Sequence, residues 1–430
     1  MIQTTPYWWE DAWPISVPPK PLPSNTDVVV VGGGYTGLST ALTLLKNGRS
    51  VVVIEAGRVA EGASSRNGGM CGDQLKPRFD DLSARFGRSM ASRLCGEARD
   101  ALVYFQDFLS DNQIRCDFEK CGRLTGALSE AQLAGVLRES ETLRRHAGIE
   151  YDVVEKSDCA KELGTEVYVG ARLYRHHAGI HPAKYARELA RCVLGAGGVI
   201  CESTAFLSSA SMAEGFSIRT SAGEIRGRDL VMATNGYSAG SGQSLRRRLV
   251  PVTSYMIATA ELPAGLMAKI MPRGRMVTDT NRLLCYYRPS PDRKRILFGG
   301  RPAYREISPY ASAQRLVSYL RTLFPALENI EVSHSWFGMI AYTFDRLPHA
   351  GEMNGFHYAG GYCGSGVVMA TWLGNKVANR ILGRPEGKTA FAEIGHPAHP
   401  LYFGRPWFLP LVQAWYQAGD LWDRRGQTSR

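Results

Sequence analysis

The sequence predicts an α/β fold, in which a Rossmann-like domain is joined to an interleaved α+β part built on an antiparallel or mixed sheet. Two units support the Rossmann-like domain. Each is a short apolar strand followed by a glycine-rich turn and a helical pattern, at 27–54 and at 356–383. The β-rich run 250–300 and the helical stretch 312–323 support the second part. With 430 residues, 44% of them hydrophobic and 21% charged, the chain is long enough for two or three domains.

The first unit has the spacing of a dinucleotide-binding turn. The β-branched run 27–31 predicts a strand buried on both faces, and apolar residues repeat at helical spacing over 38–45. The turn between them reads G-x-G-x-x-G, which permits a tight bend, close approach of a pyrophosphate and close packing of helix on strand. Glu55 ends the next strand and is placed to accept hydrogen bonds from an adenosine ribose. Both FAD and NAD satisfy this unit.

A second polar, glycine-rich loop follows directly. Residues 62–69, GASSRNGG, offer hydroxyl, amide and backbone donors beside the phosphate-binding turn. A nicotinamide site does not require such a loop, whereas the loop suits a longer cofactor with a ribityl chain.

The late unit supplies another helix N-terminus. Residues 356–359 are expected to form a short strand that runs into GGYCGSG, and the helical pattern after it stops before Gly383. Backbone N–H groups at 364–367 would stabilise the negative charge that a reduced isoalloxazine carries at N1 and at the C2 carbonyl. The two turns are therefore expected to hold opposite parts of one FAD molecule.

These motifs, together with RHHAGIHPAKYARELA, VMATNGY, LLCYYRPSPDRKRILFGG and FGMIAYTFDRLPHAG, resemble the FAD-dependent amino acid and amine oxidases of the D-amino-acid oxidase class. Within that class the chain looks most like the bacterial γ-glutamylputrescine oxidases. The resemblance spans nearly the whole chain and implies a set of FAD-binding residues. The set comprises Gly32, Gly34, Tyr35, Thr36, Gly37, Glu55, Ala56, Ser64, Ser65, Arg66, Asn67, Gly68, Gly69, Met70, Phe206, Ala233, Thr234, Gly364, Ser365, Gly366 and Val367.

The converging turns imply two discontinuous domains. Residues 1–85, 170–245 and 340–430 are expected to form the FAD-binding domain, because both glycine-rich turns and the strand RDLVMATNG must reach one ligand. Residues 86–169 and 246–339 are expected to form the substrate-binding domain, which would cover the flavin and build the substrate pocket.

The resemblance implies catabolic oxidation of a C–N bond in an amine or secondary amino acid to an imine, with O2 reduced to H2O2. Three positions depart from monomeric sarcosine oxidases: Val368 and Leu297 stand where those enzymes have lysines, and Ile340 where they have the cysteine that binds flavin covalently. The departures favour noncovalent FAD and disfavour sarcosine as substrate. Two alternatives stay open: a cyclic imino acid oxidase of the pipecolate or proline type, and a dehydrogenase of the same fold that passes electrons to another acceptor.

No side chain is assigned as a catalytic acid or base, since hydride removal from a neutral amine demands none. Aromatic walls would desolvate the amine, and an arginine could hold a substrate carboxylate. Alternation along CYYRP sends neighbouring tyrosines to opposite faces, so only one of the two is expected to line a given pocket. The candidate substrate contacts are Tyr255, Tyr286, Tyr287, Arg288, Trp336, Tyr342 and Arg346.

The remaining features favour a cytoplasmic enzyme that acts on small molecules. Nine cysteines without a Cys-x-x-Cys pair are typical of reduced thiols, and no apolar run reaches the length of about 18 residues that spans a bilayer. The formal charge of +11 is dispersed, which favours a solvated surface; an RNA-modifying flavoprotein is the alternative.

Two further features are expected to be structural: a pair of histidines and an aromatic stripe near the C-terminus. His177 and His181 lie four apart, but Gly179 and Pro182 break any helix there, so a turn that caps the next helix is expected instead of a metal pair. A stripe near the C-terminus is expected to pack on the second domain, with membrane association as the alternative. This stripe comprises Trp407, Phe408, Leu411, Trp415 and Tyr416.

Overall fold

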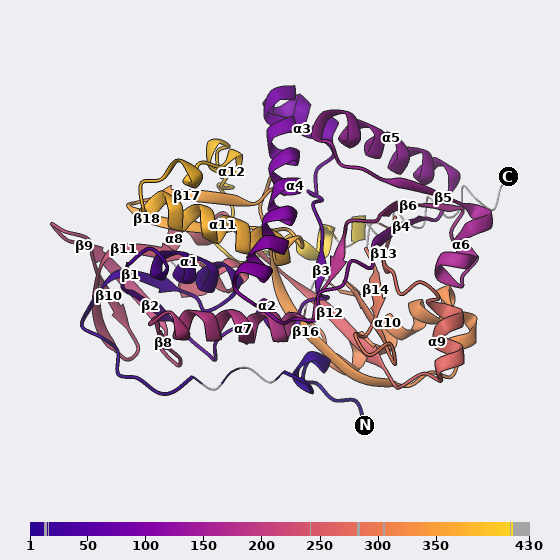
Figure 1. The fold of residues 1–430 in the computed structure, drawn as a ribbon, viewed down its shortest axis with the longest axis horizontal. Coiled ribbons are helices and arrows are strands. Elements are labelled where there is room, and N and C mark those ends of the chain that lie inside the picture. Colours follow the sequence, from indigo (N-terminus) through magenta and orange to yellow (C-terminus); the bar gives the residue numbers. More distant parts are fainter. Residues whose placement is uncertain are drawn as a thin grey trace.

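The computed structural model describes residues 1–12, 15, 17–240, 242–281, 284–303, 306–412 and 414–415. Two large sheets lie side by side, the first built from early, central and late segments and the second mostly from the middle of the chain (Figure 1). Helix α4 (Arg88–Asp111) stands between them and packs on helices of both parts.

The first sheet has the strand order β17-β18-β11-β1-β2-β8, with β9 and β10 as a hairpin beside β11. The five strands from β18 to β8 run parallel, and β17 is antiparallel to β18. Its strands are β1 (Asn25–Val31), β2 (Val51–Ile54), β8 (Val199–Cys201), β9 (Phe206–Ser211), β10 (Phe216–Thr220), β11 (Gly223–Met232), β17 (His349–Met353) and β18 (Phe356–Gly360). Helices α1 (Tyr35–Leu45), α7 (Pro182–Gly195) and α11 (Gly366–Ile381) belong to this part. The Rossmann-like α/β prediction is confirmed.

The second sheet has the order β16-β12-β15-β14-β13-β4-β6-β5 and is antiparallel except between β13 and β4, which confirms the predicted antiparallel or mixed sheet. Its strands are β4 (Arg123–Ala127), β5 (Asp152–Glu155), β6 (Gly170–Tyr174), β12 (Val250–Thr259), β13 (Met276–Asp279), β14 (Tyr286–Pro289), β15 (Ile296–Gly300) and β16 (Val332–Tyr342). Its helices are α5 (Glu130–Ala147), α6 (Lys156–Leu163), α9 (Ala264–Ile270) and α10 (Pro309–Leu323).

Short elements complete the described chain. They are α2 (Ala63–Arg66), α3 (Phe79–Phe86), α8 (Gly242–Arg246), α12 (Ala390–Glu393), the two-residue strands β3 (Met70–Cys71) and β7 (Ala178–Gly179), and 3-10 turns at Tyr7–Trp9, Asn235–Gly240, Pro325–Leu327 and Pro385–Gly387. The N-terminal arm is part of the core, because Trp8 is fully buried and its indole N–H donates to the Asn67 carbonyl at 2.8 Å.

None of the described helices is long and apolar enough to cross a membrane. In the predicted C-terminal stripe Phe408 packs near the rings of Phe344 and Tyr402, whereas Trp407, Leu411 and Trp415 are exposed. Tyr416 lies outside the described residues.

Candidate active site

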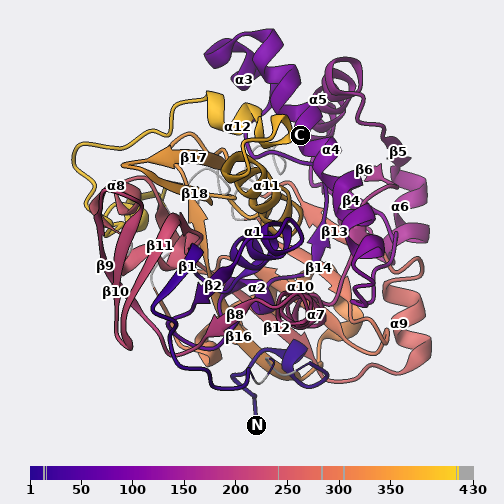
Figure 2. The ribbon, with the colours of Figure 1, turned by 60° about the vertical axis from the view of Figure 1, so that its left-hand side comes forward.

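One cavity of about 960 Å³ lies between the two sheets and touches both glycine-rich turns. This volume is at the upper end of the range of about 300–1,000 Å³ that is usual for ligand pockets. Helices α1 and α11, which follow the two turns, lie side by side at the centre of the molecule (Figure 2). The Ser39 hydroxyl donates to the Thr371 carbonyl at 2.8 Å, and the Thr36 and Tyr362 hydroxyls lie 2.6 Å apart. The packing of these helices brings both turns to one space.

The first turn is shaped for a ligand that approaches its backbone. Gly32 has a φ of +106°, and a Cβ there would lie 2.9 Å from the Ala233 carbonyl oxygen. Gly34 precedes α1 and offers no side-chain cap, while the Tyr35 N–H donates to the Ser64 hydroxyl at 3.0 Å. The positive end of the helix dipole still favours an anionic ligand beside this turn. The Glu55 carboxylate accepts from the Gly33 N–H at 2.7 Å and the Gly57 N–H at 3.0 Å, which fixes it beside the turn.

The second turn repeats this arrangement. Ser365 precedes α11 and its side chain does not cap the helix; instead its hydroxyl donates to the Gln74 carbonyl at 2.9 Å. Gly374 permits the close contact with α1, since a Cβ there would lie 2.6 Å from the Thr36 carbonyl oxygen. Two uncapped helix N-termini at one cavity fit the pyrophosphate and the flavin end of FAD.

Most of the predicted FAD-binding residues line the cavity. Those that do are Gly32, Gly34, Tyr35, Thr36, Glu55, Ala56, Ser64, Arg66, Asn67, Gly68, Met70, Phe206, Ala233, Thr234, Gly364, Ser365, Gly366 and Val367. Gly37 and Gly69 do not, because their space is filled by backbone: a Cβ would lie 1.9 Å from the Gly32 oxygen and 2.2 Å from the Ile180 oxygen, respectively.

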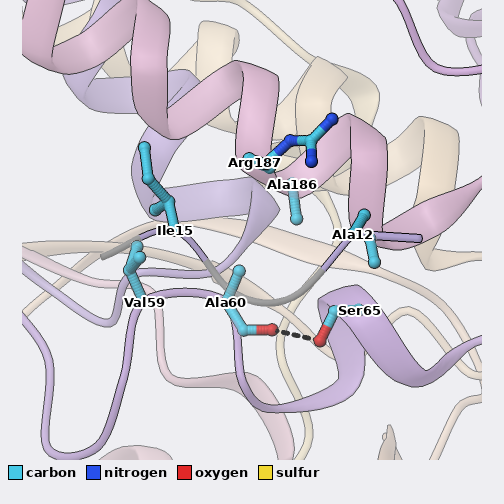
Figure 3. A pocket seen from close by; sticks show the side chains of 8 residues that line it. Ala12, Ile15, Val59, Ala60, Ser65, Ala186 and Arg187 are labelled. Carbon is cyan, nitrogen blue, oxygen red and sulfur yellow. Dashed lines mark hydrogen bonds between the residues drawn. The ribbon is translucent and has the colours of Figure 1, made fainter. Parts of the chain in front are cut away.

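Ser65 also points away from the large cavity. Its hydroxyl donates to the Ala60 carbonyl at 2.7 Å and accepts from the Trp9 indole N–H at 3.1 Å. It lines a separate void of about 10 Å³, shown in Figure 3, which has room for about one water molecule. Ser65 therefore braces the 62–69 loop through its side chain.

The tyrosine pair on β14 is divided by the pleat. Tyr286 lines the cavity, whereas Tyr287 lies on the opposite face, in the core of the second sheet, with its hydroxyl 3.2 Å from that of Tyr168. The expectation that only one of the pair faces a given pocket is met, and the side chain that faces this one is Tyr286. Glycine at 299 leaves room for its ring, because a Cβ there would lie 2.2 Å from it.

The other substrate-contact candidates do not line this cavity. Arg288 is buried and donates to the carbonyls of Gly69 and Ile180 at 3.1 and 2.9 Å. Its guanidinium therefore holds the end of the 62–69 loop to the second sheet. The remaining candidates are used as follows. Tyr255 accepts from the Ile307 N–H at 2.8 Å, Trp336 donates to the Arg66 carbonyl at 2.8 Å, the Tyr342 ring lies 5.2 Å from the Arg301 guanidinium, and Arg346 is exposed.

Sequence reasoning missed the polar groups that the second sheet and its surroundings give to the cavity. They include Lys76, Arg123, Thr125, Arg172, Ser254, Thr278, Asp279 and Arg301. Local patterns carry little signal for them, since they come from four strands or from loops that meet only through sheet pairing. Lys76 lies in the stretch QLKPR, shortly after the 62–69 loop, and this position in the chain could have suggested it.

His177 and His181 do not form a pair; His177 instead clusters with His176 and Asp73. His181 caps α7 by accepting from the Lys184 N–H at 3.2 Å, as the turn prediction required. His176 and His177 instead contact the two carboxylate oxygens of buried Asp73, at 2.7 and 2.6 Å. Burial, with the Arg123 charge nearby, lowers the pKa of His177 to about 3, so it is neutral. Neutral His177 is therefore hydrogen-bonded to the Asp73 carboxylate.

Comparison with known proteins agrees with this geometry. Residues 27–380 match the model of the DAO family, described as FAD dependent oxidoreductase. The chain is 30% identical over 402 residues to γ-glutamylputrescine oxidoreductase of Escherichia coli strain K12, with 93% of each chain covered.

The fold is shared with solved structures. L-proline dehydrogenase of P. horikoshii superposes with a TM-score of 0.72 at 20% identity, covering 91% of this chain and 99% of that one. Glycine oxidase of Geobacillus kaustophilus gives a TM-score of 0.72 at 23% identity, covering 88% and 100%. At these identities the structural likeness concerns the fold, and the family match spans the cavity and both turns. The chain belongs to the DAO family of FAD-dependent oxidoreductases.

Proposed function

We propose that the protein oxidises the C–N bond of an amine or secondary amino acid to an imine, which water then hydrolyses. FAD held in the cavity would supply the two-electron acceptor, and O2 would be the final acceptor, reduced to H2O2. The observation that carries the proposal is the single cavity that joins two uncapped helix N-termini to a wall of polar and aromatic side chains from the second sheet.

The residues of the first sheet would hold the cofactor in stages. Gly32 to Thr36 and Glu55 would take the adenosine and pyrophosphate, with Phe206, Ala233 and Thr234 beside them. The 62–69 loop would follow the ribityl chain, and the N–H groups of 364–367 would face the ring. Noncovalent binding is supported by Cys363, which lines the cavity but whose thiol pKa burial raises to about 11. A thiol with so high a pKa is a poor nucleophile at neutral pH.

The residues of the second sheet would prepare the substrate. The ring of Tyr286 and the side chains of Met256 and Phe337 line the cavity and exclude water from the reacting carbon. Lys76 and Arg301 also line the cavity. Their positive charges disfavour protonation of a bound amine and so lower the pKa of that amine. The neutral amine, whose lone pair assists hydride departure, is thereby favoured.

Two substrate types remain distinct candidates. The E. coli relative is named for γ-glutamylputrescine, a long amine, and the size of the cavity suits such a molecule together with FAD. A cyclic imino acid is the second candidate, which the fold shared with L-proline dehydrogenase and the proline-like alternative from the sequence both favour. A dehydrogenase that passes electrons to another carrier would use the same cavity.

We also propose the division into an FAD-binding domain and a substrate-binding domain, with one adjustment. Strand β6 opens the segment 170–245, yet it pairs with β4 and β5 of the second sheet. The boundary is therefore better placed after Tyr174. A cytoplasmic location is in keeping with the nine described cysteines, which are all free thiols.

Anaerobic reduction of the purified yellow protein tests the proposal. Amines from γ-glutamylputrescine to pipecolate, proline and glycine are added one at a time, and the flavin absorbance near its visible maximum is followed. The expected result is rapid bleaching by one class of amine and peroxide release when air is admitted. Bleaching without peroxide would assign a dehydrogenase, and protein that neither contains nor takes up FAD would overturn the proposal.

A further inference from the structure

Three tryptophans hold three consecutive residues of the 62–69 loop, each through its indole N–H. Trp9 donates to the Ser65 hydroxyl at 3.1 Å, Trp336 to the Arg66 carbonyl at 2.8 Å and Trp8 to the Asn67 carbonyl at 2.8 Å. An indole N–H donates and cannot accept, so each ring fixes the direction of one acceptor in the loop. The rings themselves do not line the cavity, and they therefore hold the loop from another side.

The loop has little regular structure of its own. Its helix α2 is a single turn of four residues without a side-chain cap. Four of the loop side chains line the cavity, namely those of Ser64, Arg66, Asn67 and the backbone position Gly68. The shape of the loop at the cavity thus depends on groups that hold it from outside.

Two of the three indoles belong to the N-terminal arm, residues 1–12. The arm lies along β16 of the second sheet (Figure 1). The Gln3 N–H donates to the Ser333 carbonyl at 2.8 Å, and the Ser335 N–H donates to the Gln3 carbonyl at 2.9 Å. The arm therefore ties the second sheet to the loop that is expected to follow the ribityl chain of FAD.

The arm also supports the wall of the cavity. Trp8 and Trp9 are buried in one apolar cluster with Met256, and Tyr286 packs against that cluster. Met256 and Tyr286 both line the cavity. A change in the position of the arm would consequently reach the loop and the wall together.

Arg66 links the arm to whatever the loop binds. Its guanidinium lies 4.6 Å from the centre of the Trp9 ring, within the range of a cation–π contact, and its side chain lines the cavity. An anionic ligand that orders Arg66 also orders the surface on which Trp9 packs. The diphosphate of FAD is such a ligand.

We propose that the N-terminal arm is a strap that closes on the 62–69 loop when FAD binds, and that Trp8 and Trp9 are positioning residues that slow the release of FAD in return. Two events that order the same loop favour each other by the same factor. The inference deepens the proposed function, on whose cofactor site it rests, by naming the segment that controls cofactor retention.

Hydrogen exchange of the arm, followed by mass spectrometry, tests the coupling in the full-length wild type. The N–H groups of Gln3, Trp9, Glu10 and Ala12 donate to backbone carbonyls, so their exchange reports whether the arm is docked. FAD is added stepwise to FAD-stripped protein, and occupancy is read from the quenching of flavin fluorescence. Exchange in residues 1–12 is expected to slow at least tenfold, in step with occupancy. Helix α5, which does not line the cavity, is the internal control and should keep the same exchange rate throughout.

Release of FAD from the holoenzyme tests the reverse direction. Trp8→Phe and Trp9→Phe each remove one indole N–H and keep an aromatic ring. Each is expected to release FAD at least threefold faster after dilution, and the double variant at least tenfold faster, as measured by the recovery of FAD fluorescence. Trp372→Phe is the matched control, because its indole N–H donates to the Glu97 carboxylate at 2.8 Å, between α11 and α4; it should release FAD at the wild-type rate.

Arm exchange that is the same at every FAD concentration would overturn the inference, as would an equal change in α5, which would indicate general loosening without FAD. Unchanged release from Trp9→Phe, or equal acceleration in Trp372→Phe, would overturn it too. The exchange measurement needs no variant, so the test stands even if Trp8→Phe does not fold. Neither measurement involves turnover. If the arm responds to FAD but no amine reduces the flavin, only the proposed function fails; if amines reduce the flavin while the arm is indifferent to FAD, only this inference fails.

Discussion

Gly37→Ala tests whether the first turn depends on close contact between helix and strand. Gly37 is the third residue of α1, and a Cβ there would lie 1.9 Å from the Gly32 carbonyl oxygen and 3.1 Å from a Val30 methyl carbon. To restore an ordinary contact of 3.4 Å, the oxygen would have to move by about 1.5 Å. It has little freedom to do so, because the Gly32 N–H donates to the Ile54 carbonyl at 2.9 Å and anchors the turn to β2.

The expected sign follows from comparing two effects. Alanine in place of glycine within a helix normally stabilises it by about 1 kcal/mol. Overpacking in a tightly filled place costs about 1–3 kcal/mol, occasionally more, and here the obstacle is backbone, which does not rotate away. The clash should prevail, so Gly37→Ala should lose stability and shift the peptide groups that are proposed to bind the pyrophosphate.

The assay measures FAD content after gel filtration and the melting temperature with added FAD. Gly37→Ala should lose at least nine-tenths of its bound FAD and melt several degrees lower, at roughly 2–4 °C per kcal/mol for a domain of about 150–250 residues. Gly96→Ala is the matched control, since Gly96 lies inside α4 and a Cβ there meets nothing within 4 Å. Full FAD content and an unchanged melting temperature in Gly37→Ala would refute the reasoning.

Further predictions follow from the same geometry. Glu55→Gln should weaken FAD binding at least tenfold in a fluorescence titration, because it removes the carboxylate that the Gly33 N–H contacts; an unchanged Kd would contradict this. Tyr286→Leu should raise KM for the amine severalfold, whereas Tyr287→Phe should lower only the melting temperature. The opposite pattern would indicate that Tyr287 and not Tyr286 faces the substrate. Arg288→Met should lose both FAD and stability, and a change confined to KM would restore it as a substrate contact.

The elements of the first sheet that carry the glycine-rich turns could be predicted from the sequence, because their signals are local. Residues 27–54 contain strand, turn, helix, strand and terminal acid within one short stretch, and the structure forms β1, α1 and β2 there in that order. The late turn is equally local, and 18 of the 21 predicted residues line the cavity. The three that do not are Gly37 and Gly69, which pack against backbone, and Ser65, whose hydroxyl accepts from the indole of Trp9 in the distant N-terminal arm.

The substrate side was predicted less completely because pairing between distant strands decides it. Alternation alone requires Tyr286 and Tyr287 to face opposite ways, but it does not say which of them faces the cavity. The register with β13, which sets Tyr286 opposite Thr278, decides that, and a slip of one residue would exchange their roles.

The arginines show the same limit most clearly. Arg288 stands in a conspicuous motif, yet it is buried as a brace that donates to the Gly69 and Ile180 carbonyls. Arg123 and Arg172 lie in unremarkable stretches 49 residues apart in the chain and face one cavity only because β4 pairs with β6. An arginine that is committed to carbonyl groups has little capacity left for a ligand, whereas Arg123 and Arg172 each keep an Nε–H group without a partner among the described residues. The distinction depends on partners, and these are set by the fold as a whole.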